Sequence, residues 1–330
     1  MDTRRRRLLA ALPAWPLGLA ATAAPAQPPA TWLLATGYRA ESFHTQNLQQ
    51  FGADVEQASG GALHIDLRPG GSLMKLRDIF PGVAGGQVAA GEAIMSAIAP
   101  EVPEAGADSV PFIVGSYEDA RRLWKVQRPA VERRFQEKGV HLLYAVPWPP
   151  QGLYSVSPVA STADLKTGRM RTFDATTARI AELVGARPVD IAMVDLPARL
   201  VAGDIDSMVT SAVTGIETRA WSRMRYYYSV NAFFPKNAVF VNARAYAALD
   251  ARTRAAVDTA AQAAEERGWA LSRSQQAAAD TELKARGMSV ERPSRQLEEE
   301  IRRLGERFAR EWVHAAGKAA TDILVPYYFN

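Results

Sequence analysis

Cysteine is absent from the 330 residues of the chain. The chain therefore has no disulfide framework, no thiolate zinc site, no iron–sulfur cluster and no cysteine nucleophile. Histidine is scarce, and the histidines stand too far apart in the sequence for a local metal motif such as H-E-x-x-H. They are His44, His64, His141 and His314. We expect neither a metal nor another cofactor.

Recognisable enzyme motifs are missing as well: there is no G-x-S-x-G elbow, no G-x-x-x-x-G-K-[ST] loop and no G-x-G-x-x-G fingerprint. The densest acidic group is Asp190, Asp195, Asp204 and Asp206. A calcium or carboxylate-pair site is one interpretation of this group, but each aspartate borders an expected strand, helix start or turn, which favours capping and turn roles. We therefore expect no enzyme. The alternative is a secreted hydrolase or lyase that pairs His44 with Asp190 or Asp195.

The first 26 residues have the order of a secretory signal peptide. Four arginines at 4–7 precede an apolar stretch, and small residues lead to Ala26, after which we expect cleavage. A membrane anchor is disfavoured because the apolar stretch is shorter than the ~20 residues that span a bilayer and contains Pro13 and Pro16. Export through the general secretory route and through the twin-arginine route both remain open. The pattern predicts a periplasmic protein.

A large surplus of one charge is also lacking once this segment is removed. The whole chain carries a net charge of +4, but residues 1–26 hold four of its 39 basic and one of its 35 acidic side chains, so the remainder has a net charge of +1. Arginine pairs such as those at 121–122 and 302–303 alternate with glutamates and apolar residues, which indicates solvated helix faces. We expect no nucleic-acid partner, because nucleic-acid binding needs a clustered basic face.

What is present is an alternation of strand and helix patterns. A short apolar run at 31–36, helical spacing at 48–58 and alternation at 63–67 predict a β-α-β start, which favours mainly parallel sheets. Three prolines within 145–153 mark the best candidate for a crossing between domains. Proline is absent from 251–286, where the composition predicts one helix of about 54 Å, long enough to brace two domains.

A second α/β unit follows the proline-rich segment. Its expected strands are 168–173 and 188–191, and its expected helices are 176–184 and 196–202. Further strands are expected at 205–210 and 238–241. An amphipathic stretch over 296–320 is expected to be the last element before the tail TDILVPYYFN.

Arg171 is the most informative charged residue. It stands inside a strand pattern on the same side as Arg169 and Phe173. Its planar guanidinium presents a fork of donors that matches a carboxylate. From the pattern alone, an arginine that covers a sheet edge or pairs with a nearby acid is equally consistent.

Three segments resemble the extracytoplasmic solute-binding proteins of TRAP (tripartite ATP-independent periplasmic) transporters, the DctP-like family. They are FGADVEQASGGALHIDLRPGGSL, DSVPFIVGSYEDARRLW and DLKTGRMRTFDATTARIAELVGARPVDIAMVDLPARLVAGDIDSMVTS. The last resembles the family's G-K-x-R strand, the following helix, the PV strand and the G-x-x-D turn. The resemblance covers nearly all of the chain after residue 26.

The resemblance implies an α/β, two-lobed periplasmic-binding-protein fold with a hinge and a long helix that spans both lobes. We expect lobe I to comprise residues 27–148 plus about 237–276. Lobe II would comprise residues 149–236 plus about 277–330.

The resemblance also implies a ligand site in the cleft between the lobes. The family's signature arginine, which pairs with the carboxylate of an organic acid, falls on Arg171, and two other ligand-facing positions fall on Met193 and Thr210. A further arginine of some members has no counterpart near Gln151, which disfavours a dicarboxylate or a sialic-acid-like ligand.

Other side chains complete the expected site. Large apolar groups at expected cleft positions are Trp148, Phe173 and Trp221, although each also suits core packing. Tyr38, Arg39, Phe43 and His44 lie on the loop after the first strand, where Arg39 or His44 is expected to contact a second oxygen function of the ligand.

The sequence therefore predicts a periplasmic solute-binding protein of a TRAP transporter. Its ligand is expected to be a monocarboxylate with an apolar or aromatic body, such as a 2-oxo or 2-hydroxy acid. We expect a monomer that delivers the ligand to the small and large TRAP membrane subunits. A binding protein that serves a sensor kinase or an ATP-driven permease is the alternative within the same class.

Overall fold

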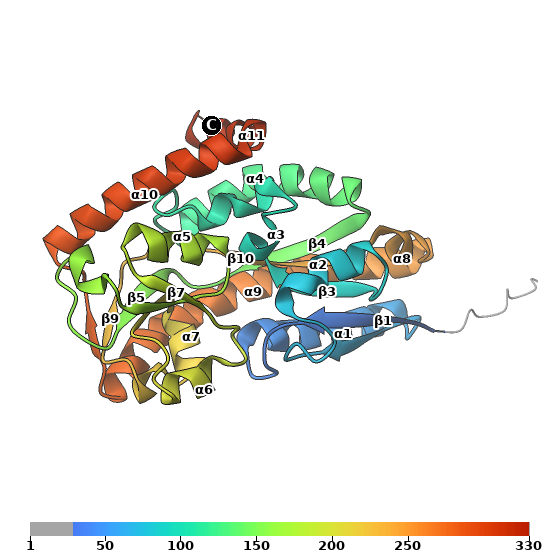
Figure 1. The fold of residues 1–330 in the computed structure, drawn as a ribbon. Coiled ribbons are helices and arrows are strands. Elements are labelled where there is room, and N and C mark those ends of the chain that lie inside the picture. The colour runs from blue at the N-terminus through green and yellow to red at the C-terminus, as the bar shows by residue number, and fades with distance from the viewer. Residues whose placement is uncertain (1–28, 330) are drawn as a thin grey trace, which may run out of the picture.

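The structure, a computed structural model, describes residues 29–329. The expected signal peptide lies outside the described residues. Two β-sheets, each flanked by helices, sit side by side along the long axis of the molecule (Figure 1). This is the two-lobed α/β architecture that the resemblance implied.

Sheet A has five strands in the order β2-β1-β3-β10-β4. Their bounds are β1 (Ala30–Thr36), β2 (Leu63–Arg68), β3 (Ala90–Ile94), β4 (Val140–Pro147) and β10 (Lys236–Asn242). The helices of this part of the chain are α1 (Phe43–Ser59), α2 (Leu76–Ala84), α3 (Met95–Ile98), the 3-10 helix η1 (Pro103–Ser109), α4 (Tyr117–Glu137) and α8 (Ala243–Ala247).

Sheet B has six strands in the order β11-β9-β5-β8-β6-β7. Their bounds are β5 (Gln151–Ser155), β6 (Arg169–Thr172), β7 (Arg187–Asp190), β8 (Ser207–Ser211), β9 (Tyr226–Tyr228) and β11 (Ser289–Glu291). The helices between these strands are η2 (Thr162–Leu165), α5 (Ala175–Leu183), α6 (Leu196–Val201), α7 (Ala212–Glu217) and η3 (Ala220–Ser222).

The sheets are mixed, whereas the sequence favoured mainly parallel ones. Among the described strands, five pairs are parallel and four are antiparallel. Every antiparallel pair contains β10 or β5. The chain passes from β4 to β5 and returns from β9 to β10, so the outgoing and returning strands run in opposite directions.

The two crossing segments are hydrogen-bonded to each other. Trp148 N donates to Pro235 O at 2.8 Å, and Gln151 N donates to Phe233 O at 3.0 Å. Ala232 N returns a bond of 2.9 Å to Gln151 O. The proline-rich segment is therefore one of two hydrogen-bonded segments that connect the sheets, and a hinge between the lobes would lie in these segments.

A third connection is the helix α9 (Ala251–Ala285), whose 35 residues confirm the expected long helix. It packs against α1 and β4 of one lobe and against α7 and β11 of the other. Small residues let it approach closely, since a Cβ at Gly268 would lie 2.4 Å from Val146.

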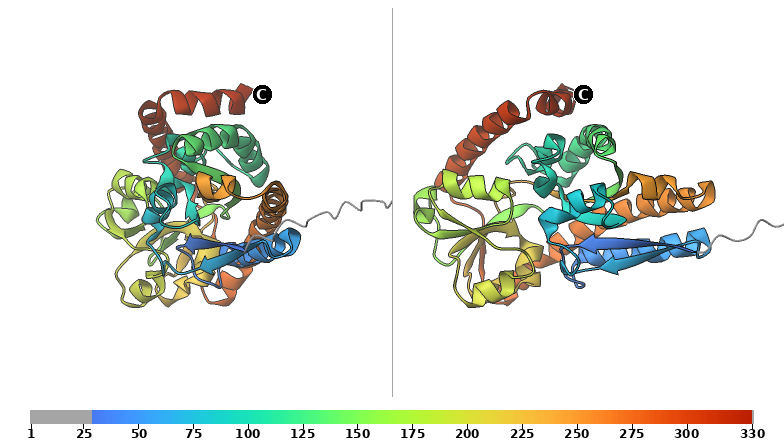
Figure 2. Two further views of the ribbon diagram at one scale, coloured as in Figure 1. Left: turned by 90° about the vertical axis from the view of Figure 1, so that its right-hand side faces the viewer. Right: turned by 45° about the vertical axis from the view of Figure 1, so that its right-hand side comes forward.

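The chain ends in two helices, α10 (Arg295–Ala316) and α11 (Lys318–Phe329), so the expected tail is helical. The predicted division placed residues 277–330 in lobe II, yet α11 packs on α4 and η1 beside sheet A (Figures 1 and 2). The exact lobe boundaries stay a prediction. Within residues 29–329, none of the helices combines the length and apolar character needed to cross a membrane.

A buried ion pair anchors the start of β10. Lys236 Nζ lies 3.1 Å from Asp108 Oδ2, and the two side chains are 0% and 1% exposed. Asp108 Oδ2 also accepts from Lys236 N at 2.8 Å. Burial lowers the pKa of Lys236 and raises that of Asp108, and each charge opposes this shift in the other. Such a pair costs desolvation, but loss of one partner leaves the other charge unpaired in the core.

We therefore expect Lys236→Met to lower the free energy of unfolding by roughly 3–5 kcal/mol, because the Asp108 carboxylate then stays buried without its cation. The double variant Asp108→Asn, Lys236→Met removes both charges and keeps an oxygen for the backbone N–H of residue 236. It should recover most of the loss in urea unfolding. A double variant as unstable as the single one would contradict this account.

Candidate functional site

A cleft of about 680 Å³ lies between the two sheets. In parallel sheets, ligands bind where the carboxyl ends of the strands meet. Here the residues just after β1, β2 and β3 form one wall, and those at the ends of β6, β7 and β8 form the other. The β-α order of both halves therefore brings six strand ends to one cavity.

Arg171 provides the buried positive charge of this cleft. Its side chain is 3% exposed, its Nε donates to Ile191 O at 3.0 Å, and its guanidinium carbon lies 4.7 Å from the Phe173 ring centroid. Burial lowers its pKa to about 10, although the charges of Asp174 and Asp190 oppose this. Among the described residues, Arg171 forms no ion pair with a carboxylate. The fork of terminal nitrogens remains available to an anionic ligand.

Asp174 brings a carboxylate to the same cavity. It caps α5 by accepting from Thr177 N at 2.8 Å, and its Oδ2 accepts from Ser96 Oγ at 2.5 Å. Ser96 follows β3 of sheet A, so this bond joins the two walls. Thr210, Thr214 and Gln151 add further polar groups to the lining.

Two aromatic rings form the wall on the side of sheet A. Tyr38 and Trp148 are each 4% exposed and line the cleft with ring centroids 5.3 Å apart. Tyr38 OH donates to Asn237 Oδ1 at 3.2 Å, and Trp148 Nε1 donates to the same oxygen at 2.9 Å. Burial raises the pKa of Tyr38, so the hydroxyl keeps its proton. The rings present apolar surface while their polar atoms are occupied behind it.

Six of the residues singled out from the sequence line this cleft. They are Tyr38, Trp148, Arg171, Phe173, Met193 and Thr210. Their assignment as ligand contacts remains a prediction. Because all six line the same cleft, the prediction now refers to a single site.

The other four, Arg39, Phe43, His44 and Trp221, do not line the cleft. Phe43 is the first residue of α1 and is buried in the core. Arg39 is exposed and its Nη2 donates to Val194 O at 3.0 Å. His44 is 1% exposed, and its ring lies behind Trp148 at a centroid distance of 4.3 Å, because the first turn of α1 directs it into the core. Burial lowers the pKa of His44, so it is neutral at pH 7. Trp221 packs against the core under the Arg286 guanidinium, 5.0 Å from its ring centroid.

Asp174 and Ser96 were missed as site residues. Asp174 carries a signal, since an aspartate followed by Ala-Thr-Thr at a strand end is typical of a helix N-cap, but capping alone does not predict a cleft. Ser96 carries none, because nothing local relates it to Asp174, 78 positions away.

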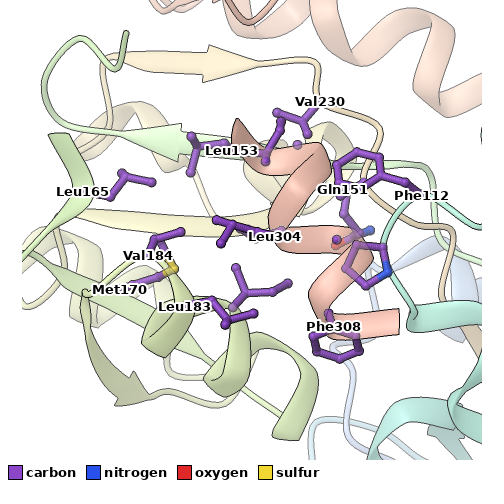
Figure 3. Close-up of a pocket in the computed structure, with 17 residues that line it drawn as sticks. Phe112, Gln151, Leu153, Leu165, Met170, Leu183, Val184, Val230, Leu304 and Phe308 are labelled. Carbon is purple, nitrogen blue, oxygen red and sulfur yellow. The ribbon is translucent and has the colours of Figure 1, made fainter. Parts of the chain in front are cut away.

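A second, smaller pocket of about 70 Å³ lies under α10 in the lobe of sheet B (Figure 3). Leu153, Met170, Val184 and Leu304 line it, and it shares Gln151 with the cleft. None of its lining residues is charged, so it has no cation to pair with a carboxylate. Within residues 29–329, no group of three or more His, Asp or Glu side chains could hold a metal ion.

Comparison with known proteins agrees with this geometry. The model of the bacterial extracellular solute-binding protein family 7, DctP, matches residues 34–314. A solute-binding protein from Albidiferax ferrireducens is 31% identical over 180 residues. That match covers 54% of this chain and 53% of the relative, so it spans about half of that protein's length.

Solved structures match over nearly the whole chain. DctP6, an extracytoplasmic solute receptor of Bordetella pertussis that binds pyroglutamic acid, is 35% identical with a TM-score of 0.89, over 91% of this chain and 100% of that one. DctP7 of the same organism, which also binds pyroglutamic acid, is 37% identical with a TM-score of 0.88, over 90% and 99%.

A TRAP solute-binding protein from a marine metagenome, specific for pyroglutamate, is 32% identical with a TM-score of 0.88, over 91% of this chain and 99% of that one. These matches confirm the resemblance seen in the sequence. The chain belongs to family 7 of the bacterial extracellular solute-binding proteins, the DctP family of TRAP solute receptors.

Proposed function

We propose that this chain captures pyroglutamate, or a closely similar small cyclic monocarboxylate, in the cleft. The observation that carries the proposal is Arg171, a buried guanidinium that lines the cleft and, within residues 29–329, forms no ion pair with a carboxylate. The three pyroglutamate-binding relatives, at 32–37% identity, support the choice of ligand.

The lining suits the groups of this ligand. Its carboxylate would pair with the two terminal nitrogens of Arg171, and its ring would pack on Phe173 and the Trp148 wall. A lactam N–H needs an acceptor, and Asp174 Oδ2, which lines the cleft and accepts one hydrogen bond from Ser96 Oγ, would accept a second from it. Hydroxyls such as that of Thr210 would donate to the lactam oxygen.

Capture depends on contacts from both walls. A ligand held by Arg171 on one lobe and by the Tyr38–Trp148 wall on the other favours the arrangement in which the lobes are close. The paired crossing strands form the connection about which such a movement would take place.

The remaining expectations follow from the family. Its members are binding proteins, and we propose that this chain likewise returns its ligand chemically unchanged. We further propose that it works in the periplasm as a monomer and delivers its ligand to the small and large TRAP membrane subunits. The extracytoplasmic receptors among the relatives support this assignment.

Calorimetric titration with a panel of carboxylates tests the ligand. Pyroglutamate should bind more tightly than proline, glutamate, 2-oxo acids or dicarboxylates, because among these compounds only pyroglutamate presents one carboxylate and one neutral N–H donor. The ligand recovered after incubation should be chemically unchanged by mass spectrometry. Tight binding confined to sugars or amines, or any turnover, would refute the proposal.

The role of Arg171 is tested by Arg171→Met. Affinity for pyroglutamate should fall about 30-fold or more, since removing one member of a buried charge pair costs roughly 2–5 kcal/mol. The ligand-free protein should become more stable in thermal unfolding, because a buried cation whose burial Asp174 and Asp190 only partly offset is replaced by an apolar chain of similar length.

Arg169→Met is the matched control on the same strand. Arg169 pairs with Asp206 at 2.8 Å and lies outside the cleft lining, so its loss should leave the affinity unchanged. Equal losses of affinity in the two variants would contradict the proposal that Arg171 pairs with the ligand carboxylate.

Export can be tested on the full chain. Intact mass and N-terminal sequencing of the protein recovered from the periplasm should show a mature chain that begins at Gln27. Retention of the first 26 residues on a membrane-bound product would overturn the signal-peptide assignment.

A further inference from the structure

A carboxylate lies buried behind the aromatic wall of the cleft. Glu92, in the middle of β3, is 1% exposed and does not line the cleft. His44 is the nearest basic group, with its Nδ1 3.4 Å from Glu92 Oε1, and burial keeps His44 neutral at pH 7. Among the described residues, no lysine or arginine forms an ion pair with Glu92. An acid buried without a cation costs stability unless hydrogen bonds satisfy its oxygens.

Two neighbours on the same face of sheet A satisfy these oxygens. Thr36 Oγ1 donates to Glu92 Oε2 at 2.6 Å, and Asn237 Nδ2 donates to Glu92 Oε1 at 3.0 Å. Each neighbour in turn binds the wall of the cleft. Thr36 Oγ1 accepts from Tyr38 N at 3.3 Å, and Asn237 Oδ1 accepts from both Tyr38 OH and Trp148 Nε1.

Glu92 therefore fixes the orientation of the Asn237 amide. The NH₂ group must face the carboxylate, which accepts hydrogen bonds, and this turns the amide oxygen toward the two rings. A reversed amide would place NH₂ against two donors, Tyr38 OH and Trp148 Nε1. The hydrogen bonds therefore all run toward Glu92: the two rings donate to Asn237, the backbone N–H of Tyr38 donates to Thr36, and Asn237 and Thr36 donate to Glu92.

We infer that Glu92 is a positioning residue for the ligand cleft, acting through Asn237 and Thr36 to hold the Tyr38 and Trp148 rings in their binding arrangement. This inference rests on the proposed function, because its effect on affinity is read with pyroglutamate. Trp148 and Asn237 also flank the two crossing segments, so the network ties the ligand wall to the connection between the lobes.

The charged and titratable groups around the carboxylate come from three elements. They are His44 of α1, Tyr38 after β1 and Tyr144 of β4. Burial raises the pKa of both tyrosines and lowers that of His44, so all three are neutral at pH 7. Moving the carboxylate from one member of the network to another therefore tests this set of hydrogen bonds.

The test exchanges the carboxylate and the amide of the hydrogen bond between Glu92 and Asn237. Asn237→Asp keeps an oxygen for the two rings but sets a second carboxylate against Glu92. The double variant Glu92→Gln, Asn237→Asp reverses the direction of this one bond, because the amide introduced at position 92 donates to the new carboxylate and its oxygen still accepts from Thr36. The total charge of the double variant equals that of the wild type.

Asn237→Asp should weaken pyroglutamate binding by about tenfold or more, because an unsatisfied buried polar contact costs about 1–3 kcal/mol, more when charged. The double variant should recover most of the affinity. A matched control is Asn47→Asp, since Asn47 is buried and hydrogen-bonded to Ala264 O and Arg267 but lies outside the cleft. Asn47→Asp should lower stability without weakening the affinity of the folded protein.

A second readout needs no ligand. The Trp148 contribution to the near-ultraviolet circular dichroism is the part of the spectrum that Trp148→Phe removes, and it reports how rigidly this indole is held. This contribution should decrease in Asn237→Asp and recover in the double variant. If wild type ignores pyroglutamate but this signal follows the exchange, the proposed function fails and the positioning role stands. The inference would be overturned if a folded Asn237→Asp protein kept both its affinity and its Trp148 signal. It would also be overturned if the double variant recovered stability but neither affinity nor signal.

Discussion

A buried guanidinium that forms no ion pair in the described part of the chain is the constraint around which the cleft is arranged. Arg171 is 3% exposed and lines the cavity, and burial disfavours its charge in the unliganded chain more than Asp174 and Asp190 favour it. A bound carboxylate would pair with the guanidinium and remove this cost. The cost in the unliganded protein therefore adds to the free energy of ligand binding. Stability and affinity are therefore expected to oppose each other at this position.

The second wall works differently. Its polar atoms are already satisfied behind the rings, so Tyr38 and Trp148 offer apolar surface to the ligand. One wall thus supplies an unsatisfied charge and the other a preorganised surface. The Ser96–Asp174 and Arg39–Val194 hydrogen bonds join the walls directly. These bonds, the crossing strands and α9 together set how the lobes meet.

Local patterns predicted the elements well and their long-range contacts poorly. The absence of proline over 251–286 predicted α9, and alternation around Arg171 predicted β6. His44 was misplaced because a loop position does not reveal which way the first turn of a helix faces. Ser96 could not be found, since its partner lies on the other lobe. The mixed sheets follow from the double crossing, which no local pattern encodes.

The Asp108–Lys236 pair lies on the opposite face of β10 from the ligand wall. Lys236 and Asn237 are adjacent, so their side chains leave the strand in opposite directions, one toward Asp108 and the other toward Glu92. If β10 shifted by one residue, the Lys236 ammonium group would take the place of the Asn237 amide. Asp108 would then be buried in an apolar core without its cation. The ion pair therefore fixes the register of β10. This register places Asn237 Oδ1 where it accepts hydrogen bonds from both Tyr38 OH and Trp148 Nε1.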